Sequence, residues 1–233
     1  MWSKRIWRRI DVREKFNQKF SLPLKPTTDR ISLFDAMVCA VERGRLTAYN
    51  PGTLGDDDSF TKAYTYTEFK DQIERVDTQY VEDPDTEQSI AVPVVTKTET
   101  KDIRFFVLKE DWFFDKQRST MDVRIIGVAP VKATYADDGS FKGYQIMFWS
   151  YFPELRTLLT NVDSYNSGND SERRTFDDVF AKRMFHSVII KESNVFDRNI
   201  SEYKKGLNAL IEGDGINEDI RNMEQDMWSY WPS

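Results

Sequence analysis

Few residues in this sequence are suited to catalysis, and they lie far apart along the chain. A catalytic histidine needs a nucleophile or a carboxylate beside it, and nothing nominates one for the single histidine, His186. Its apolar neighbours Phe185 and Val188 favour a partly buried structural role, within a helix that begins near Thr175. The single cysteine, Cys39, is predicted to be a small buried side chain. One histidine and one cysteine cannot form a histidine-rich or cysteine-based metal site.

Carboxylates are the remaining catalytic candidates, because a glycosidase needs only two of them. The best pair lies among Glu110, Asp111 and Asp115, next to Trp112. We favour the alternative, a β-strand whose side chains alternate between two faces. The acidic run at 56–58 lacks the spacing of an EF-hand loop and is predicted to be a solvated loop. The sequence therefore predicts no catalytic residue, no cofactor site and no metal site.

A basic aromatic cluster near the start of the chain is the strongest candidate for binding. Indole and guanidinium groups are enriched at the centres of protein–protein interfaces. Nucleic acid and an anionic membrane surface are the other partners that such a cluster suits. A formal net charge of −6 argues against a nucleic-acid binder. We predict a protein interface that contains Trp2, Arg5, Trp7, Arg8 and Arg9.

Charge is spread unevenly along the chain. Residues 1–30 contain nine Lys/Arg and three Asp/Glu, which gives a net charge of +6. Residues 51–90 contain three Lys/Arg and eleven Asp/Glu, which gives −8, and residues 207–233 contain one and six, which gives −5. A basic N-terminal segment therefore accompanies an acidic body, and such complementary charge steers association and partner choice.

Turn signals and periodicity predict the elements that position these residues. Capping-box patterns predict helix starts at Ser32–Asp35, Thr65–Glu68 and Thr175–Asp178. Stretches rich in Val, Ile, Phe and Trp predict strands within 102–115, 121–131 and 143–152. Short connections between these strands favour an antiparallel meander. Later helices are predicted after Pro153 and on both sides of a break at 213–215.

Helices on both sides of a strand-rich middle indicate the α+β class. We predict an antiparallel sheet from the central third, packed with helices from the N-terminal and C-terminal thirds. Residues 1–30 are predicted to be a basic aromatic arm, and residues 31–233 a single α+β domain with a helical C-terminal part. The arm and residues 77–89 are expected to be mobile, because they carry few apolar anchors relative to charge. No apolar run is long enough to predict a membrane-spanning segment, and no signal peptide is expected.

Several ordered blocks of the sequence resemble the GldN/PorN family. The most specific block is Lys109–Ser119, and it is followed by Asp122–Pro130. Further blocks that match in order are 7–15, 44–49, 151–154, 174–180 and 189–195. Blocks of this length, spread over nearly the whole chain, are far more specific than a short motif.

The resemblance implies a role in assembly and no enzymatic activity. The family provides a periplasmic ring component of the type IX secretion and gliding-motility machinery of Bacteroidetes. It implies a non-enzymatic structural subunit located in the periplasm, peripheral to the outer membrane. The implied partners are an outer-membrane ring lipoprotein, the periplasmic part of an inner-membrane motor complex, and copies of the same chain. In such a ring, the basic and acidic segments are expected to form complementary faces between neighbours. The alternatives are a carboxylate-dependent hydrolase and an anionic-surface binding module.

Overall fold

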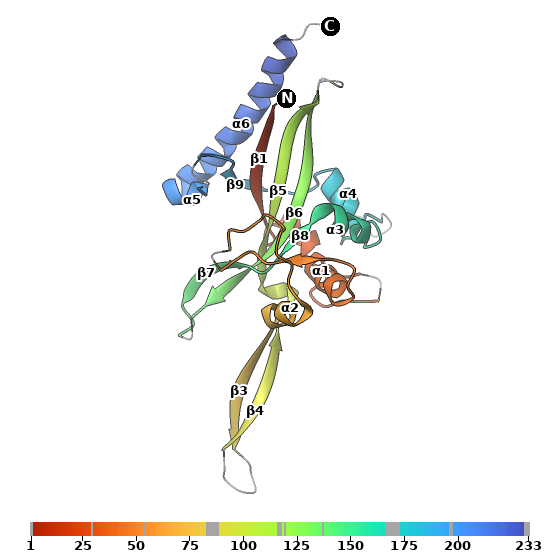
Figure 1. Ribbon diagram of the computed structural model, residues 1–233, viewed down its shortest axis with the longest axis vertical. Helices are drawn as coiled ribbons and strands as arrows, with labels where there is room; N and C mark the ends of the chain where they lie inside the picture. Colours follow the sequence, from red (N-terminus) through yellow and green to blue (C-terminus); the bar gives the residue numbers. More distant parts are fainter. Residues whose placement is uncertain are drawn as a thin grey trace.

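A computed structural model describes residues 2–28, 30–53, 55–82, 89–115, 118, 120–136, 138–165, 173–195 and 198–230. Within these ranges it describes all side chains except those of 75–82, 89–92 and 227–230. The chain forms one large antiparallel sheet, a separate two-stranded ribbon, and helices that pack on the sheet (Figure 1). The predicted α+β class is confirmed.

The large sheet has seven strands in the order β2-β8-β6-β5-β1-β9, with β7 also pairing with β6. Every pairing between neighbours is antiparallel. The strands are β1 (Ser3–Asp11), β2 (Ala48–Tyr49), β5 (Ile103–Asp115), β6 (Thr120–Tyr135), β7 (Phe141–Ile146), β8 (Trp149–Tyr151) and β9 (Val188–Glu192). Strands β5 to β8 occupy the three stretches predicted from composition. Strand β6 pairs antiparallel with β5, β7 and β8, and β7 and β8 lie one after the other along its second edge.

Strand β1 corrects one prediction from the sequence. It lies inside the sheet between β5 and β9, and its residues Ile6 and Ile10 have no exposed surface. The predicted arm outside the domain is therefore wrong for residues 3–11, and the division of the rest of the chain into domains stays a prediction. The sequence did not predict this strand, because four of its residues are basic and basic residues are usually exposed.

The helices are α1 (Leu33–Glu42), α2 (Tyr66–Ile73), α3 (Phe152–Leu159), α4 (Phe176–Ala181), α5 (Ile200–Tyr203) and α6 (Leu207–Tyr230). Short 3-10 turns cover Lys15–Phe20 and Thr100–Asp102. All three predicted N-caps are confirmed, since the side chains of Ser32, Thr65 and Thr175 accept backbone N–H groups three residues later. These caps satisfy amide donors that have no partner within the helix.

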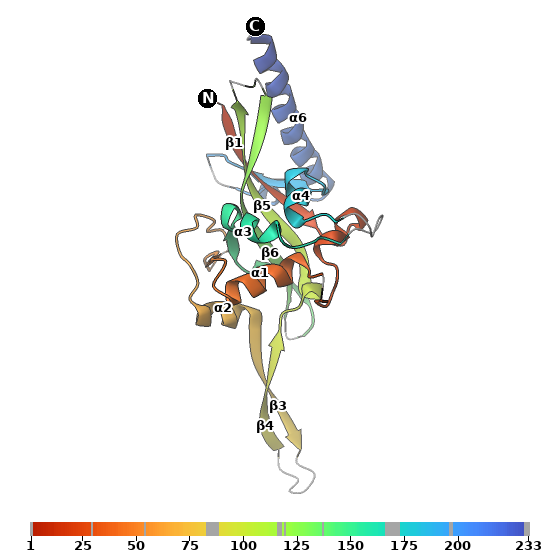
Figure 2. The same cartoon turned by 90° about the vertical axis from the view of Figure 1, so that its right-hand side faces the viewer.

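Two clusters of apolar side chains cover one face of the sheet, and the helices that enclose them are seen in Figure 2. Helices α1, α3 and α4 enclose an aromatic core around Phe20, whose ring centroid lies 5.5 Å from that of Phe180 and 6.1 Å from that of Phe106. Helix α6 covers the neighbouring part of this face, where Ile216 and Ile220 pack against strands β1 and β9.

The predicted helix break at 213–215 is wrong, because α6 runs through it without interruption. The chain turns earlier, between α5 and α6, where Gly206 has a φ of +57°. Gly213 instead allows a close approach: a Cβ atom at this position would lie 2.8 Å from the carbonyl oxygen of Ile189 in β9. Gly213 therefore does not end the helix, and its missing side chain lets α6 pack closely against β9.

A two-stranded antiparallel ribbon projects from the body at the end remote from both termini (Figures 1 and 2). It consists of β3 (Glu74–Glu82) and β4 (Ser89–Lys97), which pair only with each other in the described chain. Residues 77–82 and 89, predicted to be a mobile excursion, belong to these strands. Residues 83–88 of that prediction lie outside the described residues.

Replacing Ser32 with alanine is expected to lower the free energy of unfolding by about 1–2 kcal/mol. The Ser32 hydroxyl accepts the Asp35 N–H at 3.1 Å and lies 2.7 Å from the Thr100 hydroxyl, in a fully buried position. The control Ser21→Ala removes a hydroxyl near the surface and should change stability by no more than about 0.5 kcal/mol. Equal urea midpoints for the two variants would contradict this role of the cap.

Candidate interaction site

Strand β1 divides the five predicted interface residues between the two faces of the sheet. Side chains alternate along a strand, so Trp2 and Arg8 point toward α6, where Trp2 packs beside Ile216 and Ile220. Arg5, Trp7 and Arg9 occupy the opposite face. The cluster seen in the sequence is therefore not one surface patch.

A buried ion-pair cluster forms on the α6 side. Glu110 of β5 has no exposed surface, and its carboxylate accepts hydrogen bonds from Arg8 Nε at 3.1 Å and Arg183 Nη1 at 2.8 Å. The indole of Trp112 donates to the same carboxylate at 3.1 Å. Arg8 also donates to Asn217 of α6 at 2.6 Å. Burial lowers the pKa of Arg8 from its ordinary value, and Glu110 offsets part of this effect. The cluster joins β1, β5 and α6 to the loop after α4.

The position of Glu110 bears on the hydrolase alternative. Its two carboxylate oxygens are engaged by two arginines and an indole. Asp111 projects from the other face of β5, where it accepts two hydrogen bonds from Arg5. Two carboxylates on opposite faces of a strand cannot flank one bond of a substrate. The two carboxylates lie on opposite faces, as the strand interpretation predicts, and each of them pairs with arginine.

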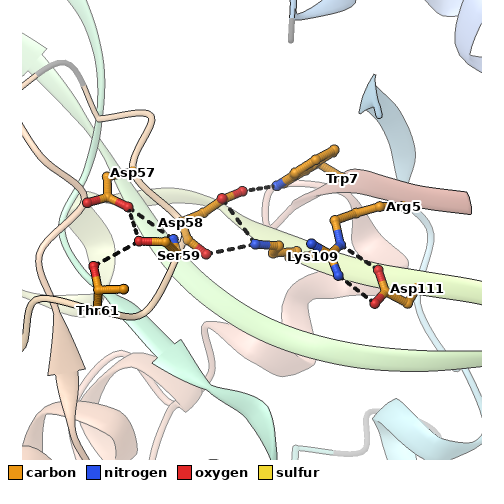
Figure 3. Close-up of polar contacts among 8 residues, drawn as sticks. All are labelled: Arg5, Trp7, Asp57, Asp58, Ser59, Thr61, Lys109 and Asp111. Atoms are coloured by element: carbon orange, nitrogen blue, oxygen red, sulfur yellow. Dashed lines mark hydrogen bonds and ion pairs between the residues drawn. The ribbon is translucent and has the colours of Figure 1, made fainter. Parts of the chain in front are cut away.

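The face opposite α6 carries a second polar cluster, in which the loop before α2 is anchored to the sheet (Figure 3). The Trp7 indole donates to Asp58 Oδ2 at 2.5 Å. Lys109 Nζ donates to the backbone carbonyl oxygen of Asp58 at 2.7 Å and to its Oδ1 at 3.0 Å. Trp7 and Lys109 are buried, and Lys191 Nζ lies 4.6 Å from the Trp7 ring centroid. Trp7 and Lys109 therefore hold the loop from within the same chain.

The rest of this acidic loop agrees with the prediction of a solvated segment. Asp56 and Asp57 are exposed, and Asp58 is half-buried. The Ser59 hydroxyl donates to Asp57 at 2.6 Å, which holds the pKa of that carboxyl below its ordinary value (Figure 3).

Beside this loop, the Arg5 guanidinium binds Asp111 with two hydrogen bonds, of 2.5 and 2.7 Å, which raise the pKa of Arg5. Docking of another protein on the five N-terminal residues stays a prediction, while Arg5, Trp7 and Arg8 have partners within the same chain.

His186 and Cys39 occupy different settings. His186 lies after the end of α4, and its side chain is 62% exposed, with Nδ1 2.6 Å from a Glu14 carboxylate oxygen. The prediction of a partly buried histidine inside a helix is wrong, because α4 ends at Ala181 and Arg183 adopts a φ of +50°. Cys39 lies on α1 as predicted, but it is partly exposed. In the described part of the chain, no three His, Cys, Asp or Glu side chains lie close enough to hold a metal ion.

A groove along the outer edge of β6 could not be predicted from the sequence. This groove has a volume of about 360 Å³ and separates the strand from helices α3 and α4. Its apolar lining includes Phe113, Val123, Phe152, Pro153 and Phe180. Its charged lining consists of Asp122, Arg124, Arg156, Asp177 and Arg183. Only the tertiary arrangement of two distant helices beside one strand creates it.

Replacing Asp58 with alanine is expected to cost about 1–2 kcal/mol of unfolding free energy, because the buried Trp7 indole loses its acceptor. The cost is limited because Lys109 keeps its bond to the backbone carbonyl of residue 58. The matched control is Asp56→Ala at an exposed position, with an expected change within about 0.5 kcal/mol. Urea unfolding followed by tryptophan fluorescence measures both, and a silent Asp58→Ala would contradict the anchoring role.

The fold and its polar clusters define an α+β protein with buried structural ion pairs and strand edges open to solvent. Within the described residues, no helix combines the length and the apolar character needed to cross a bilayer. Residues 1–229 match the family model of the gliding motility associated protein GldN, and the chain belongs to this family. The resemblance drawn from the sequence blocks is thereby confirmed. A search of curated proteins found no match.

Proposed function

We propose that this chain is a non-enzymatic structural subunit of a periplasmic ring in the type IX secretion and gliding-motility machinery. The observation that carries the proposal is the family match over residues 1–229, which includes every strand and nearly all of the last helix. Its partners are an outer-membrane ring lipoprotein, the periplasmic part of an inner-membrane motor complex and further copies of itself. The protein acts at the periplasmic side of the outer membrane.

The chemistry of the polar clusters supports an assembly role. Glu110, which is fully buried, and Asp58, which is half-buried, accept hydrogen bonds from arginine, lysine and indole donors of the same chain. These contacts fix β1, α6 and the loop before α2 against the sheet. A rigid body of this kind presents its edges and grooves in a constant geometry, which repeated assembly contacts require.

The test begins with co-purification of the protein with the ring lipoprotein of the same organism, followed by sizing and negative-stain imaging. A stable complex, and ring-shaped particles in particular, is the expected result. In cells, deletion of the gene should abolish gliding and the export of proteins that carry a C-terminal sorting signal. Normal export in the deletion strain, together with no complex at any salt concentration, would refute the proposal.

A further inference from the structure

The outer edge of β6 is open over its first half. Strand β8 pairs with Gly127 and Val128, and β7 pairs with residues 131–135. Residues 120–126 pair with β5 on one side, and no described strand pairs with their other side. The N–H of Met121 donates to the Glu224 side chain at 3.3 Å, and the N–H of Val123 to the Asp122 side chain at 2.8 Å. Side chains thus occupy donors that another strand could use.

The groove beside this edge has the chemistry of a site for an extended chain. Its apolar lining comes from both sides of the edge, since Phe113 lies on β5 and Phe152 and Phe180 lie on α3 and α4. Three arginines and two aspartates also line it. Arg183 pairs with Glu110 and Arg156 pairs with Asp177, so Arg124 is the cation that the groove presents to an incoming chain. Arg124 is exposed and stacks over the Phe113 ring at 5.7 Å from the centroid. Strand addition uses such an edge for affinity and its flanking pockets for specificity.

The ribbon has the complementary properties. A two-stranded ribbon alone is marginally stable in water, yet this one projects from the body with both outer edges unpaired in the described chain. Strand β3 contains three acids and one base, and each of its residues has an N–H group. Strand β4 contains Pro93, which removes one donor. Strand β3 is therefore the better edge for pairing, and its net negative charge is opposite to that of Arg124.

We propose that strand β3 of one copy adds to the open edge of β6 in the next copy. The ribbon and the open edge lie at opposite ends of the long axis, so one copy can donate and accept at the same time (Figures 1 and 2). Such a head-to-tail contact closes into a ring when its rotation allows. The inference rests on the proposed function and adds the contact by which copies associate.

Two variants remove the two halves of this contact. The first replaces residues 75–96 with a short Asn-Gly turn, which can join Glu74 and Lys97 because they face each other in the ribbon register. The second is Val123→Pro, which removes one outward N–H at an edge position where proline is tolerated. Val123→Ala keeps the N–H and is the matched control. Thermal melting by circular dichroism verifies that each variant is folded.

Sizing with light scattering gives the result. Wild type and Val123→Ala should form species that grow with concentration, while the ribbonless and Val123→Pro variants should remain monomers. A mixture of those two should form a one-to-one dimer and stop there, since one open edge and one ribbon remain between them. Assembly of either variant alone, or a mixture that stays monomeric, would overturn the inference.

A charge reversal tests the electrostatic part of the contact. Arg124→Glu should shift assembly to higher protein concentration at low salt, and Lys142→Glu, on β7 and away from the groove, should not. Equal behaviour of the two variants would contradict the match between groove and ribbon.

The failure of this contact is distinguishable from failure of the proposed function. A ribbonless variant that still forms rings with the lipoprotein overturns the contact and leaves the function intact. A wild type that stays monomeric at its highest soluble concentration also overturns the contact. Absence of any complex with the lipoprotein, and normal export without the protein, count against the function itself.

Discussion

Replacing Glu110 with alanine is expected to lower the free energy of unfolding by about 3–5 kcal/mol. The change leaves the guanidinium of Arg8, a residue that is 7% exposed, without its carboxylate partner. It also removes the acceptor of Arg183 and of the Trp112 indole. Breaking a buried ion pair costs more than the pair contributes, because the remaining charge stays desolvated. Urea unfolding monitored by circular dichroism measures the difference.

The neighbouring residue supplies a matched control on the same strand. Asp111→Ala breaks the pair with Arg5, whose side chain is 44% exposed, so the expected loss is below about 1 kcal/mol. Replacement of Glu110 and Arg8 together by leucine and methionine should recover part of the loss, because no charge then remains unpaired at position 8. Similar costs for Glu110→Ala and Asp111→Ala would refute the assignment of a buried cluster.

The second large effect is expected at Gly213, where leucine should cost about 3 kcal/mol, the upper end of the range for overpacking. The new Cβ atom would lie 2.8 Å from the backbone oxygen of Ile189, and a backbone atom cannot rotate away. Helix α6 must therefore move off β9, which exposes Ile216 and Ile220.

A substitution two residues later should have the opposite sign. A Cβ atom at Gly215 meets no atom within 4 Å, so Gly215→Ala should stabilise the protein by about 0.5–1 kcal/mol through helix propensity. Guanidinium unfolding of the two single variants gives both values. Destabilisation by both substitutions would show that α6 tolerates no side chain here. Stabilisation by both would contradict the close approach of Gly213 to β9.

Features of the fold that depend on residues close together in the sequence could be predicted. A capping box needs only residues three apart, so the starts at Ser32, Thr65 and Thr175 could be predicted and are confirmed. Alternation on β5 likewise separated Glu110 from Asp111 before the structure did. The close spacing of the central strands predicted their antiparallel order for the same reason.

Long-range contacts could not be predicted in this way. Basic residues are usually exposed, but Arg8 is buried because Glu110 and Asn217, both remote in the chain, accept its hydrogen bonds. The break assigned to Gly213 came from propensity, which tertiary contact with β9 overrides. The sequence predicts Trp7 as part of a binding surface, but the acceptor of its indole N–H is Asp58, in a loop that is predicted to be solvated.

The place of β1 in the sheet has a consequence for how the chain folds. Ile6 pairs with Glu110 of β5 on one side and with Glu192 of β9 on the other. The first strand in the sequence therefore has the last strand as one of its two neighbours. Chains dominated by such distant pairings fold slowly, because the entropy of loop closure is lost before native contacts form. The N-terminal half of the chain contains β1 and its partner β5 but not β9. Strand β1 is therefore an edge strand, with one side unpaired, until β9 adds to it.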